Sequence, residues 1–282
     1  MTSSEGLTVD SQRKTFNAEE LNPGALPYTY LVVSHDQMNM SPGGVIDEML
    51  VTLYVNGQDL ATVMCSPLEQ EMLAAGFLFN EGVIASPDEI ALLQANSSKT
   101  VVDVFLNRSD FSPPRRLILT SGCGGGITLD HLTESYPPLE TEFATTPQTI
   151  FALVAELRGA APLYQQVRGV HVAALADEER ILISAEDVGR HNAVDKVAGK
   201  ALLNHIPTQD HLLLTSGRIS SEMLSKARRM GTPVVVSRTS PTSITLRLAE
   251  AWGICVVGYA RGGTLRVYTH PERLGLADPR TR

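Results

Sequence analysis

The second half of the chain alternates short apolar runs with amphipathic segments. Thr146-Pro147 predicts the start of a helix that places Ile150, Leu153, Val154 and Leu157 on one face. Apolar runs beyond it predict strands over 170–176, 180–184, 211–215, 233–237 and 254–259, and amphipathic segments predict helices over 192–203, 221–230 and 241–252. Two paired strands followed by alternating helices and strands are typical of a three-layer α/β domain with a mixed sheet.

The first half predicts a smaller domain of the α+β type. Residues 49–55 form a β-rich run that ends at Asn56-Gly57, a hairpin signal. Ser66-Pro67-Leu68-Glu69 has the pattern of a capping box and predicts a helix with Leu68, Met72, Ala75 and Phe79 on its apolar face. Residues 101–106 and 117–120 predict two further strands.

Composition shifts divide the chain into four parts. We predict a flexible N-terminal tail over 1–27, an N-terminal α+β domain over 28–120, a Gly-rich cysteine loop and linker over 121–146, and a C-terminal α/β domain over 147–282. The polar, proline-bearing linker is expected to be a mobile connection between the two domains.

Composition and charge exclude several classes of protein. Hydrophobic residues make up 43% of the chain and charged residues 19%, which is a globular composition. The net charge of −8 argues against a general nucleic-acid or membrane-surface binder. The chain contains no run of about 18 apolar residues, so no membrane span is predicted. The N-terminus lacks an apolar signal core, and three widely spaced cysteines fit a reducing compartment, so we expect a cytoplasmic protein.

Cys123 is the first candidate for chemistry. It lies in Ser121-Gly122-Cys123-Gly124-Gly125-Gly126, where glycines leave the sulfur unshielded and backbone amides can stabilise a thiolate. A glycine hinge with an incidental cysteine is the alternative. Cys255 lies in an apolar strand and Cys65 precedes a helix, so both are expected to be structural. The cysteines and histidines have no structural zinc spacing.

Polar residues gather where predicted strands end in the second half. Each such junction suits a phosphate at a helix N-terminus, although helix capping with solvated charges is the simpler interpretation. Four junctions in one domain predict a shared anionic or nucleotide-like ligand. His171, inside a strand, is a minor candidate. The junction residues are Arg190 and His191; Ser216, Gly217 and Arg218; Arg238 and Ser240; and Tyr259, Ala260, Arg261, Gly262, Gly263 and Thr264.

Several long motifs together resemble one known family. They are Gly76–Gly82, Gly169–His171, Glu186–Lys196, Thr215–Met223, Tyr259–Gly263 and Tyr268–Arg273. This combination closely resembles the formate dehydrogenase accessory sulfurtransferase (FdhD) family, and the likeness extends from about residue 45 onward.

The resemblance implies a sulfurtransferase that works as a persulfide relay. Such a protein accepts sulfur from a cysteine desulfurase, here on Cys123, and delivers it to the molybdenum or tungsten bis-pterin guanine dinucleotide cofactor of formate dehydrogenase. It implies a cytidine-deaminase-like C-terminal domain, a cofactor-binding segment at Tyr259–Thr264 and a homodimer. The partners that the resemblance implies are the desulfurase and the formate dehydrogenase catalytic subunit. Guanine nucleotides such as GDP would mimic the cofactor, and no intrinsic metal is expected.

One position departs from the family pattern. The family often has a Cys-x-x-Cys pair in this loop, whereas Gly126 stands at the second position here. A persulfide relay needs only one sulfur-bearing cysteine and is still possible with this change. Sulfur transfer between two cysteines of the loop is not. Two other functions stay open: a non-catalytic nucleotide-binding chaperone of formate dehydrogenase, and a zinc deaminase, which would need a Cys/His ligand set.

Overall fold

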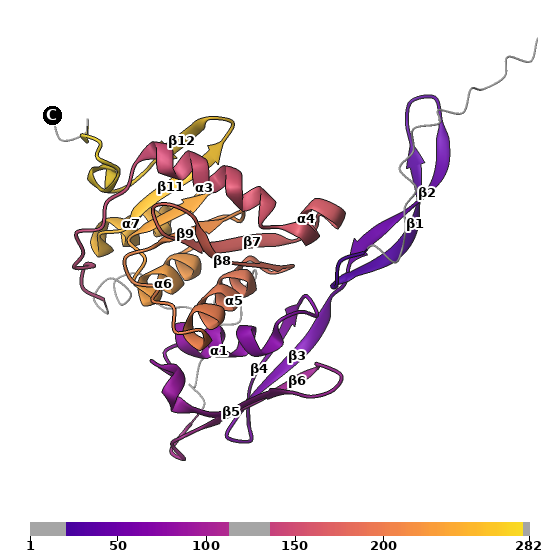
Figure 1. Ribbon diagram of the computed structural model, residues 1–282, viewed down its shortest axis with the longest axis horizontal. Coiled ribbons are helices and arrows are strands. Elements are labelled where there is room, and N and C mark those ends of the chain that lie inside the picture. Colours follow the sequence, from indigo (N-terminus) through magenta and orange to yellow (C-terminus); the bar gives the residue numbers. More distant parts are fainter. Residues whose placement is uncertain (1–20, 113–135, 279–282) are drawn as a thin grey trace, which may run out of the picture.

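The described part of the chain forms three β-sheets, one of which stands well apart from the others (Figure 1). The computed structural model describes residues 21–112 and 136–278. The C-terminal half is built around a six-stranded sheet and the N-terminal half contains a four-stranded sheet. A two-stranded sheet projects from the body. Within these ranges, none of the helices is long and apolar enough to cross a membrane.

The C-terminal sheet is mixed, as the sequence predicts. Its strands are β7 (His171–Ala176), β8 (Ile181–Asp187), β9 (Leu212–Thr215), β10 (Val234–Ser237), β11 (Cys255–Arg261) and β12 (Thr264–Val267). They lie in the order β12-β11-β10-β9-β7-β8. β9, β10 and β11 are parallel to one another, whereas β7 is antiparallel to both β8 and β9. The α/β class with a mixed sheet is therefore confirmed.

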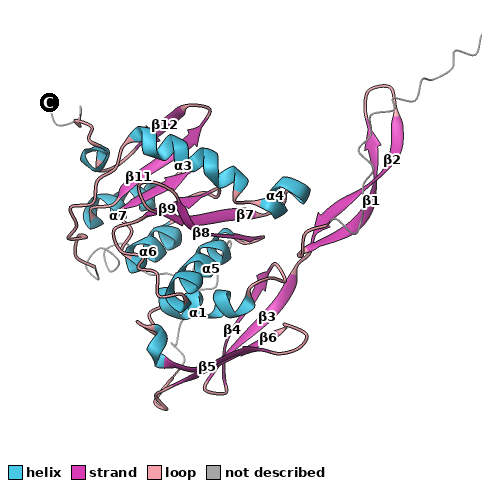
Figure 2. Cartoon of the chain, viewed as in Figure 1, coloured by secondary structure: helices cyan, strands magenta, loops and turns pink. Residues whose placement is uncertain are grey.

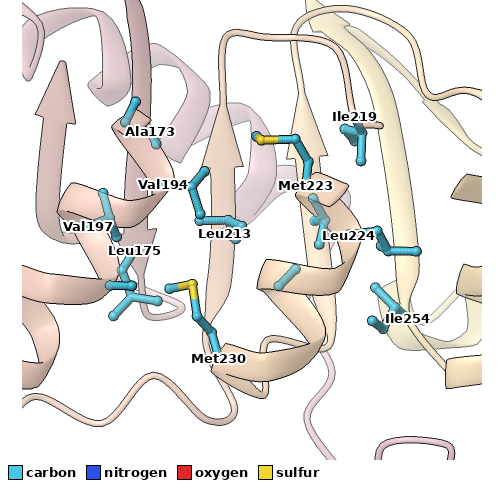
Figure 3. Close-up of a cluster of buried hydrophobic side chains, with 14 of the residues drawn as sticks. Ala173, Leu175, Val194, Val197, Leu213, Ile219, Met223, Leu224, Met230 and Ile254 are labelled. Carbon is cyan, nitrogen blue, oxygen red and sulfur yellow. The ribbon is translucent and has the colours of Figure 1, made fainter. Parts of the chain in front are cut away.

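Helices cover both faces of this sheet (Figure 2). On one face α3 (Pro147–Gly159) buries Ile150, Leu153 and Leu157 against the sheet, and Thr146 caps it as predicted. The other face is covered by α5 (Arg190–Leu203), α6 (Ser221–Met230) and α7 (Ser243–Trp252). Figure 3 shows part of that second core, where side chains from the sheet meet those from α5 and α6. Shorter helical segments are α4 (Pro162–Val167), Pro87–Glu89 and Pro271–Leu274.

The N-terminal sheet has one face covered by a helix. Its strands are β3 (Met49–Val55), β4 (Gln58–Cys65), β5 (Ile90–Ala95) and β6 (Val101–Leu106), in the order β4-β3-β6-β5. The predicted hairpin at Asn56-Gly57 joins β3 to β4, and the predicted strand over 101–106 is β6. The strand predicted over 117–120 lies outside the described residues.

The capping box predicted for the N-terminal helix is wrong. α1 spans Gln70–Asn80, and Glu69 at its N-cap is left-handed and makes no side-chain cap. Ser66 is instead buried, and its hydroxyl accepts a hydrogen bond from the Val188 amide of the other half. The Ser66 hydroxyl therefore bonds to a residue distant in sequence instead of capping the helix that follows it.

The predicted apolar face of α1 is also only partly correct. Its most buried apolar side chains are Leu73, Ala74, Ala75 and Leu78 rather than Met72 and Phe79. The helix packs between the four-stranded sheet and α5, so it buries two sides instead of one stripe (Figure 1).

Two glycines allow α1 and α5 to cross at backbone contact. A Cβ on Gly76 would lie 1.7 Å from the carbonyl oxygen of Asp195, and a Cβ on Gly199 would lie 1.9 Å from that of Met72. No side chain fits at either position. This crossing joins the N-terminal and C-terminal halves.

Two segments expected to be loose are ordered. β1 (Ala25–Val33) begins inside the predicted tail and pairs with β2 (Met38–Ile46) as a projecting hairpin. At the end of the predicted linker, Leu139 donates its amide to Trp252 O and Thr145 donates its amide to Arg273 O. The linker from residue 136 onward is therefore attached to the C-terminal half, because its backbone completes hydrogen bonds there.

Candidate functional site

The predicted junctions lie at one edge of the six-stranded sheet. β8 shares the direction of β9, β10 and β11, because β7 is antiparallel to both β8 and β9. The C-terminal ends of these four strands therefore meet at the same edge, where ligands bind in open α/β sheets. This edge carries Arg190, Arg218, Arg238 and Arg261, as the sequence pattern predicts.

The edge is too long for these residues to form one small pocket. Four strand spacings of about 4.8 Å separate β8 from β11, which is about 19 Å in all. Arg190 and Arg218 are near neighbours, because the charge of Arg218 acts on the guanidinium of Arg190. Arg261 lies at the far end of the edge. The structure thus arranges the predicted residues along a line.

Buried Asp187 fixes the junction between β8 and α5. Its carboxylate contacts Lys196 Nζ at 2.6 Å, and both side chains are fully buried. The carboxylate also accepts hydrogen bonds from the amides of Ser66 and Gly189 and from the side chain of Asn192. A buried charge with an ionic partner and several donors is held in one geometry. The start of α5 is therefore fixed to the N-terminal half through Ser66.

Arg190 begins α5 and packs against the loop after β9. A Cβ on Gly217 would lie 2.9 Å from Arg190 Cβ and 3.2 Å from His171 Nδ1, so a side chain at position 217 would displace one of them. Nε of Arg190 is buried and has no hydrogen-bond partner among the described residues. A buried guanidinium nitrogen with spare donor capacity is suited to an anion.

His191 is held as an uncharged imidazole. Burial, followed by the charges of Lys226 and Arg190, lowers its pKa from 6.5 to about 3. Its Nε2 lies 3.2 Å from a Glu222 carboxylate oxygen and 3.3 Å from Ser220 Oγ. At neutral pH the contact with Glu222 is therefore a hydrogen bond from a neutral ring, with Nε2 as the donor, and not an ion pair.

The low pKa of His191 predicts a pH dependence of stability. In the unfolded chain the imidazole takes up a proton below its ordinary pKa of 6.5, whereas the folded protein resists protonation down to about pH 3. The stability that the uncharged His191 contributes is complete above pH 6.5 and is lost as the pH falls from 6.5 to about 3. We expect the unfolding free energy of the wild type, relative to His191→Gln, to decrease between about pH 7.5 and about pH 4.5.

Urea unfolding of both proteins across that range measures this difference. His35→Gln is the control, because it removes an exposed imidazole at the end of a hairpin. Parallel curves for the wild type and His191→Gln would contradict an uncharged His191.

A cavity of about 400 Å³ lies between the two halves of the molecule. His171, Arg190 and His191 line it from the C-terminal half, and Glu48, Phe77 and Glu81 line it from the N-terminal half. The sequence analysis missed the N-terminal contribution. The motif Gly76–Gly82 was visible as part of the family pattern, but no local signal assigned Phe77 or Glu81 to a site.

The wall of this cavity contains a second buried ion pair. Lys226 Nζ contacts Asp195 Oδ1 at 2.6 Å, and Asn80 donates to the same oxygen at 2.8 Å. Burial raises the pKa of the nearby Glu81 carboxyl, although the charge of Lys226 opposes this. The lining of the cavity includes four carboxylates and two cations, Arg190 and Lys226, and the buried Nε of Arg190 has no hydrogen-bond partner among the described residues.

The predicted cofactor segment forms the turn between β11 and β12. Tyr259, Gly262 and Gly263 have positive φ angles of 51°, 59° and 74°. Arg261, both glycines and Thr264 are exposed. Ala260 is fully buried in the core beneath α3, so it offers a ligand no side chain.

Aromatic stacking shapes the base of this turn. The guanidinium carbon of Arg266 lies 4.1 Å from the centre of the Tyr259 ring, and that of Arg261 lies 5.7 Å from it. Both cations therefore lie within reach of a cation–π interaction with the same aromatic ring.

Ser216 and Ser240 are less suited to a ligand than the sequence suggests. The Ser216 hydroxyl accepts a hydrogen bond from the Val172 amide at 2.9 Å and, with Arg238, lines a small recess below α3. Ser240 accepts a hydrogen bond from Ile219 through its backbone carbonyl. Both serines thus contribute to loop structure, which agrees with the simpler interpretation of these junctions.

Cys123 lies outside the described residues. Cys65 and Cys255 are fully buried, and burial raises the pKa of each thiol to about 12. Both are protonated and shielded at neutral pH, so their predicted structural role is confirmed. Over residues 21–112 and 136–278, no group of three or more His, Cys, Asp or Glu side chains is placed to hold a metal ion. The zinc deaminase alternative finds no ligand set there.

The architecture defines a class of protein: a mixed α/β protein with an Arg-bearing sheet edge and a charged cavity between two halves. The profile of the FdhD/NarQ family matches residues 46–275. The chain belongs to the FdhD/NarQ family.

Similar proteins agree with this assignment. The protein named sulfur carrier protein FdhD in Staphylococcus aureus (strain MRSA252) is 36% identical over 234 residues, which covers 81% of this chain and 88% of the relative. The same protein of strain Newman is 35% identical over an equal length. A crystal structure from Desulfotalea psychrophila, described as a formate dehydrogenase accessory protein, aligns with a TM-score of 0.76 and 29% identity, covering 89% of this chain and 100% of the other.

Proposed function

We propose that this chain is a sulfur carrier that serves formate dehydrogenase and carries sulfur on Cys123. The observation that supports this most directly is its family membership, together with relatives named sulfur carrier protein. Two of its three cysteines are buried as protonated thiols. This leaves Cys123, with glycine on both sides, as the cysteine for the role.

In the loading step the Cys123 thiolate attacks the outer sulfur of a persulfide on a cysteine desulfurase. A new S–S bond forms on Cys123, the S–S bond on the desulfurase breaks, and its cysteine leaves as a thiolate. No net oxidation occurs, so no further reagent is required. The chain then delivers this sulfur to the molybdenum or tungsten bis-pterin guanine dinucleotide cofactor, for use by the formate dehydrogenase catalytic subunit.

The sheet edge is the proposed binding surface for that cofactor, which is a substrate of the reaction. Guanidinium groups of Arg190, Arg218 and Arg261 would hold phosphates, aided by amides at the start of α5 and α6. A span of about 19 Å suits an extended dinucleotide rather than a single phosphate. In this proposal the C-terminal half keeps the cytidine-deaminase-like designation, and the protein acts in the cytoplasm as a homodimer.

Sulfur loading tests the role of Cys123. Incubation of the intact chain with a cysteine desulfurase and cysteine is expected to add one sulfur atom, about 32 Da, located on Cys123 by peptide mass spectrometry. Cys123→Ala is expected to take up none and to leave formate dehydrogenase inactive. Cys65→Ala is a poor control because it opens a cavity; Cys65→Ser keeps the volume and should load normally.

Sulfur found on Cys65 or Cys255 would overturn the assignment. Full activation of formate dehydrogenase by Cys123→Ala would favour the alternative of a cofactor chaperone that carries no sulfur.

Nucleotide affinity tests the sheet edge. Replacing Arg218 or Arg261 by Ala is expected to weaken GDP binding by about 1.5–3 kcal/mol, the range for a hydrogen bond to a charged group. Arg180→Ala is the matched control, because Arg180 precedes β8 and so lies at the opposite edge of the same sheet. Calorimetry that finds equal affinities in all four proteins would remove these arginines from the site.

A further inference from the structure

The cavity between the two halves is lined by two charged side chains that make no hydrogen bond to the described part of the chain. One is Arg190 at the start of α5, whose buried Nε is unsatisfied. The other is Glu81 at the C-cap of α1, whose carboxylate accepts no hydrogen bond from any described residue. The charge of Glu222 acts on both groups, so both lie near it. An unused anion and an unused cation in one cavity suit a ligand that both donates and accepts hydrogen bonds.

The charges of the lining argue against an anionic ligand in this cavity. Four carboxylates line it against two cations, and His171 and His191 add no charge because burial lowers the pKa of each ring. The carboxylates would repel a phosphate that Arg190 by itself would attract. Met64 and Phe77 add apolar surface to the lining, and the volume of about 400 Å³ is within the range of small-molecule sites. The cavity therefore favours an uncharged ligand with donors and acceptors on a compact body.

We propose that the cavity binds the 2-amino-4-oxopyrimidine edge that guanine and pterin rings share. Two parallel N–H groups on this edge match the two oxygens of the Glu81 carboxylate, in the way that a guanidinium matches a carboxylate. The neighbouring carbonyl oxygen of the ring accepts a hydrogen bond from Nε of Arg190. Glu81 is thereby the residue that determines specificity, because a ring with oxygen in place of the amino group cannot donate to it.

The state of Glu81 without a ligand fits this role. Desolvation at the cavity wall raises the pKa of its carboxyl, although the charge of Lys226 opposes this. A desolvated carboxylate without a donor is costly, and two hydrogen bonds from a ring would stabilise its charged form. Binding of the ring thus supplies the partners that the protein itself does not provide.

The inference rests on the proposed function only for the source of the ring. Arg190 belongs both to this cavity and to the sheet edge proposed to hold phosphates. A bis-pterin guanine dinucleotide carries a pterin ring and a guanine ring on opposite sides of its phosphates. One of these rings would occupy the cavity while the phosphates lie along the edge, and the experiment distinguishes the two.

Binding of matched rings to the full chain tests the proposal. The probes are 6-hydroxymethylpterin and guanosine, which carry the 2-amino group, and 6-hydroxymethyllumazine and inosine, which lack it. The wild type is expected to bind at least one amino ring about 10-fold or more tightly than its matched partner, the lower end for a hydrogen bond to a charged group. Preference within the pterin pair assigns the cavity to the pterin end of the cofactor, and preference within the nucleoside pair assigns it to the guanine end.

Glu81→Gln is expected to abolish this preference, because an amide offers one acceptor oxygen where the carboxylate offers two. The variant should fold normally, since Glu81 has no hydrogen-bond partner to lose. Glu71→Gln is the matched control on the same helix: Glu71 accepts a hydrogen bond from the Ala95 amide and does not line the cavity, so this variant should keep the preference.

Three results would overturn the inference: a wild type that binds none of the four probes, equal affinity within both pairs, or a preference that Glu81→Gln retains. None of these results bears on the sulfur carrier role, which is measured separately as sulfur loaded on Cys123 of the same proteins. A chain that loads sulfur normally but fails these tests would keep its proposed function and lose only the ring site.

Discussion

Gly76→Ala is expected to destabilise the protein by about 3 kcal/mol or more. The added methyl carbon would lie 1.7 Å from the carbonyl oxygen of Asp195, and backbone cannot move aside as a flexible side chain can. Helices α1 and α5 would have to separate along the contact that joins the two halves. For a chain of this size, the change corresponds to a decrease of roughly 6–12 °C in the melting temperature, which calorimetry measures.

The matched control for this prediction is Gly159→Ala. Gly159 ends α3, and a Cβ there meets no atom within 4 Å. The alanine has the better helix propensity, so the control should change stability by less than about 1 kcal/mol. If both variants melt like the wild type, the two helices do not cross at backbone contact.

The second large effect is expected for Lys196→Met. This change removes the cation that contacts Asp187 at 2.6 Å in a fully buried site and leaves a carboxylate without its ionic partner. Breaking a buried pair on one side costs about 3–5 kcal/mol. Because Asp187 also holds Ser66 and the start of α5, loosening of this network should reduce GDP affinity as well.

Lys200→Met is the control, since Lys200 lies one turn further along the same helix and pairs with Glu69 near the surface. A partly exposed pair contributes at most about 1 kcal/mol, so this variant should unfold close to the wild type in urea. Equal stability losses in the two variants would show that burial of the Asp187–Lys196 pair does not matter.

The C-terminal half could be predicted well from local pattern. Continuous apolar runs identified β9, β10 and β11, and the helix predicted to start at Thr146-Pro147 is capped by Thr146. Parallel strands bring their C-terminal ends to one edge, so the sequence pattern by itself predicts that the polar junctions lie together. In these segments, local propensity and tertiary packing favour the same structure.

Prediction failed where a distant partner replaced a local one. Ser66 has the sequence of a helix cap, yet it is buried against Val188 from the other half of the chain. The β1–β2 hairpin (residues 25–46) was not predicted, because Pro27, Pro42 and the adjacent Gly43 and Gly44 interrupt the β pattern of its strands. The cavity was missed because Glu48 and Phe77 lie more than 90 residues from the histidines they face.

Sequence alone was enough to predict the α/β class, the order of elements in the C-terminal half, the family and the candidate sulfur-bearing cysteine. These depend on short-range periodicity and on contiguous motifs, both of which are complete within a segment. The folded structure was needed to show how the halves join, that His191 is uncharged and that the β1–β2 hairpin projects from the body with exposed apolar side chains. Those properties depend on burial, and burial is set by residues distant in sequence that pack together only in the folded chain.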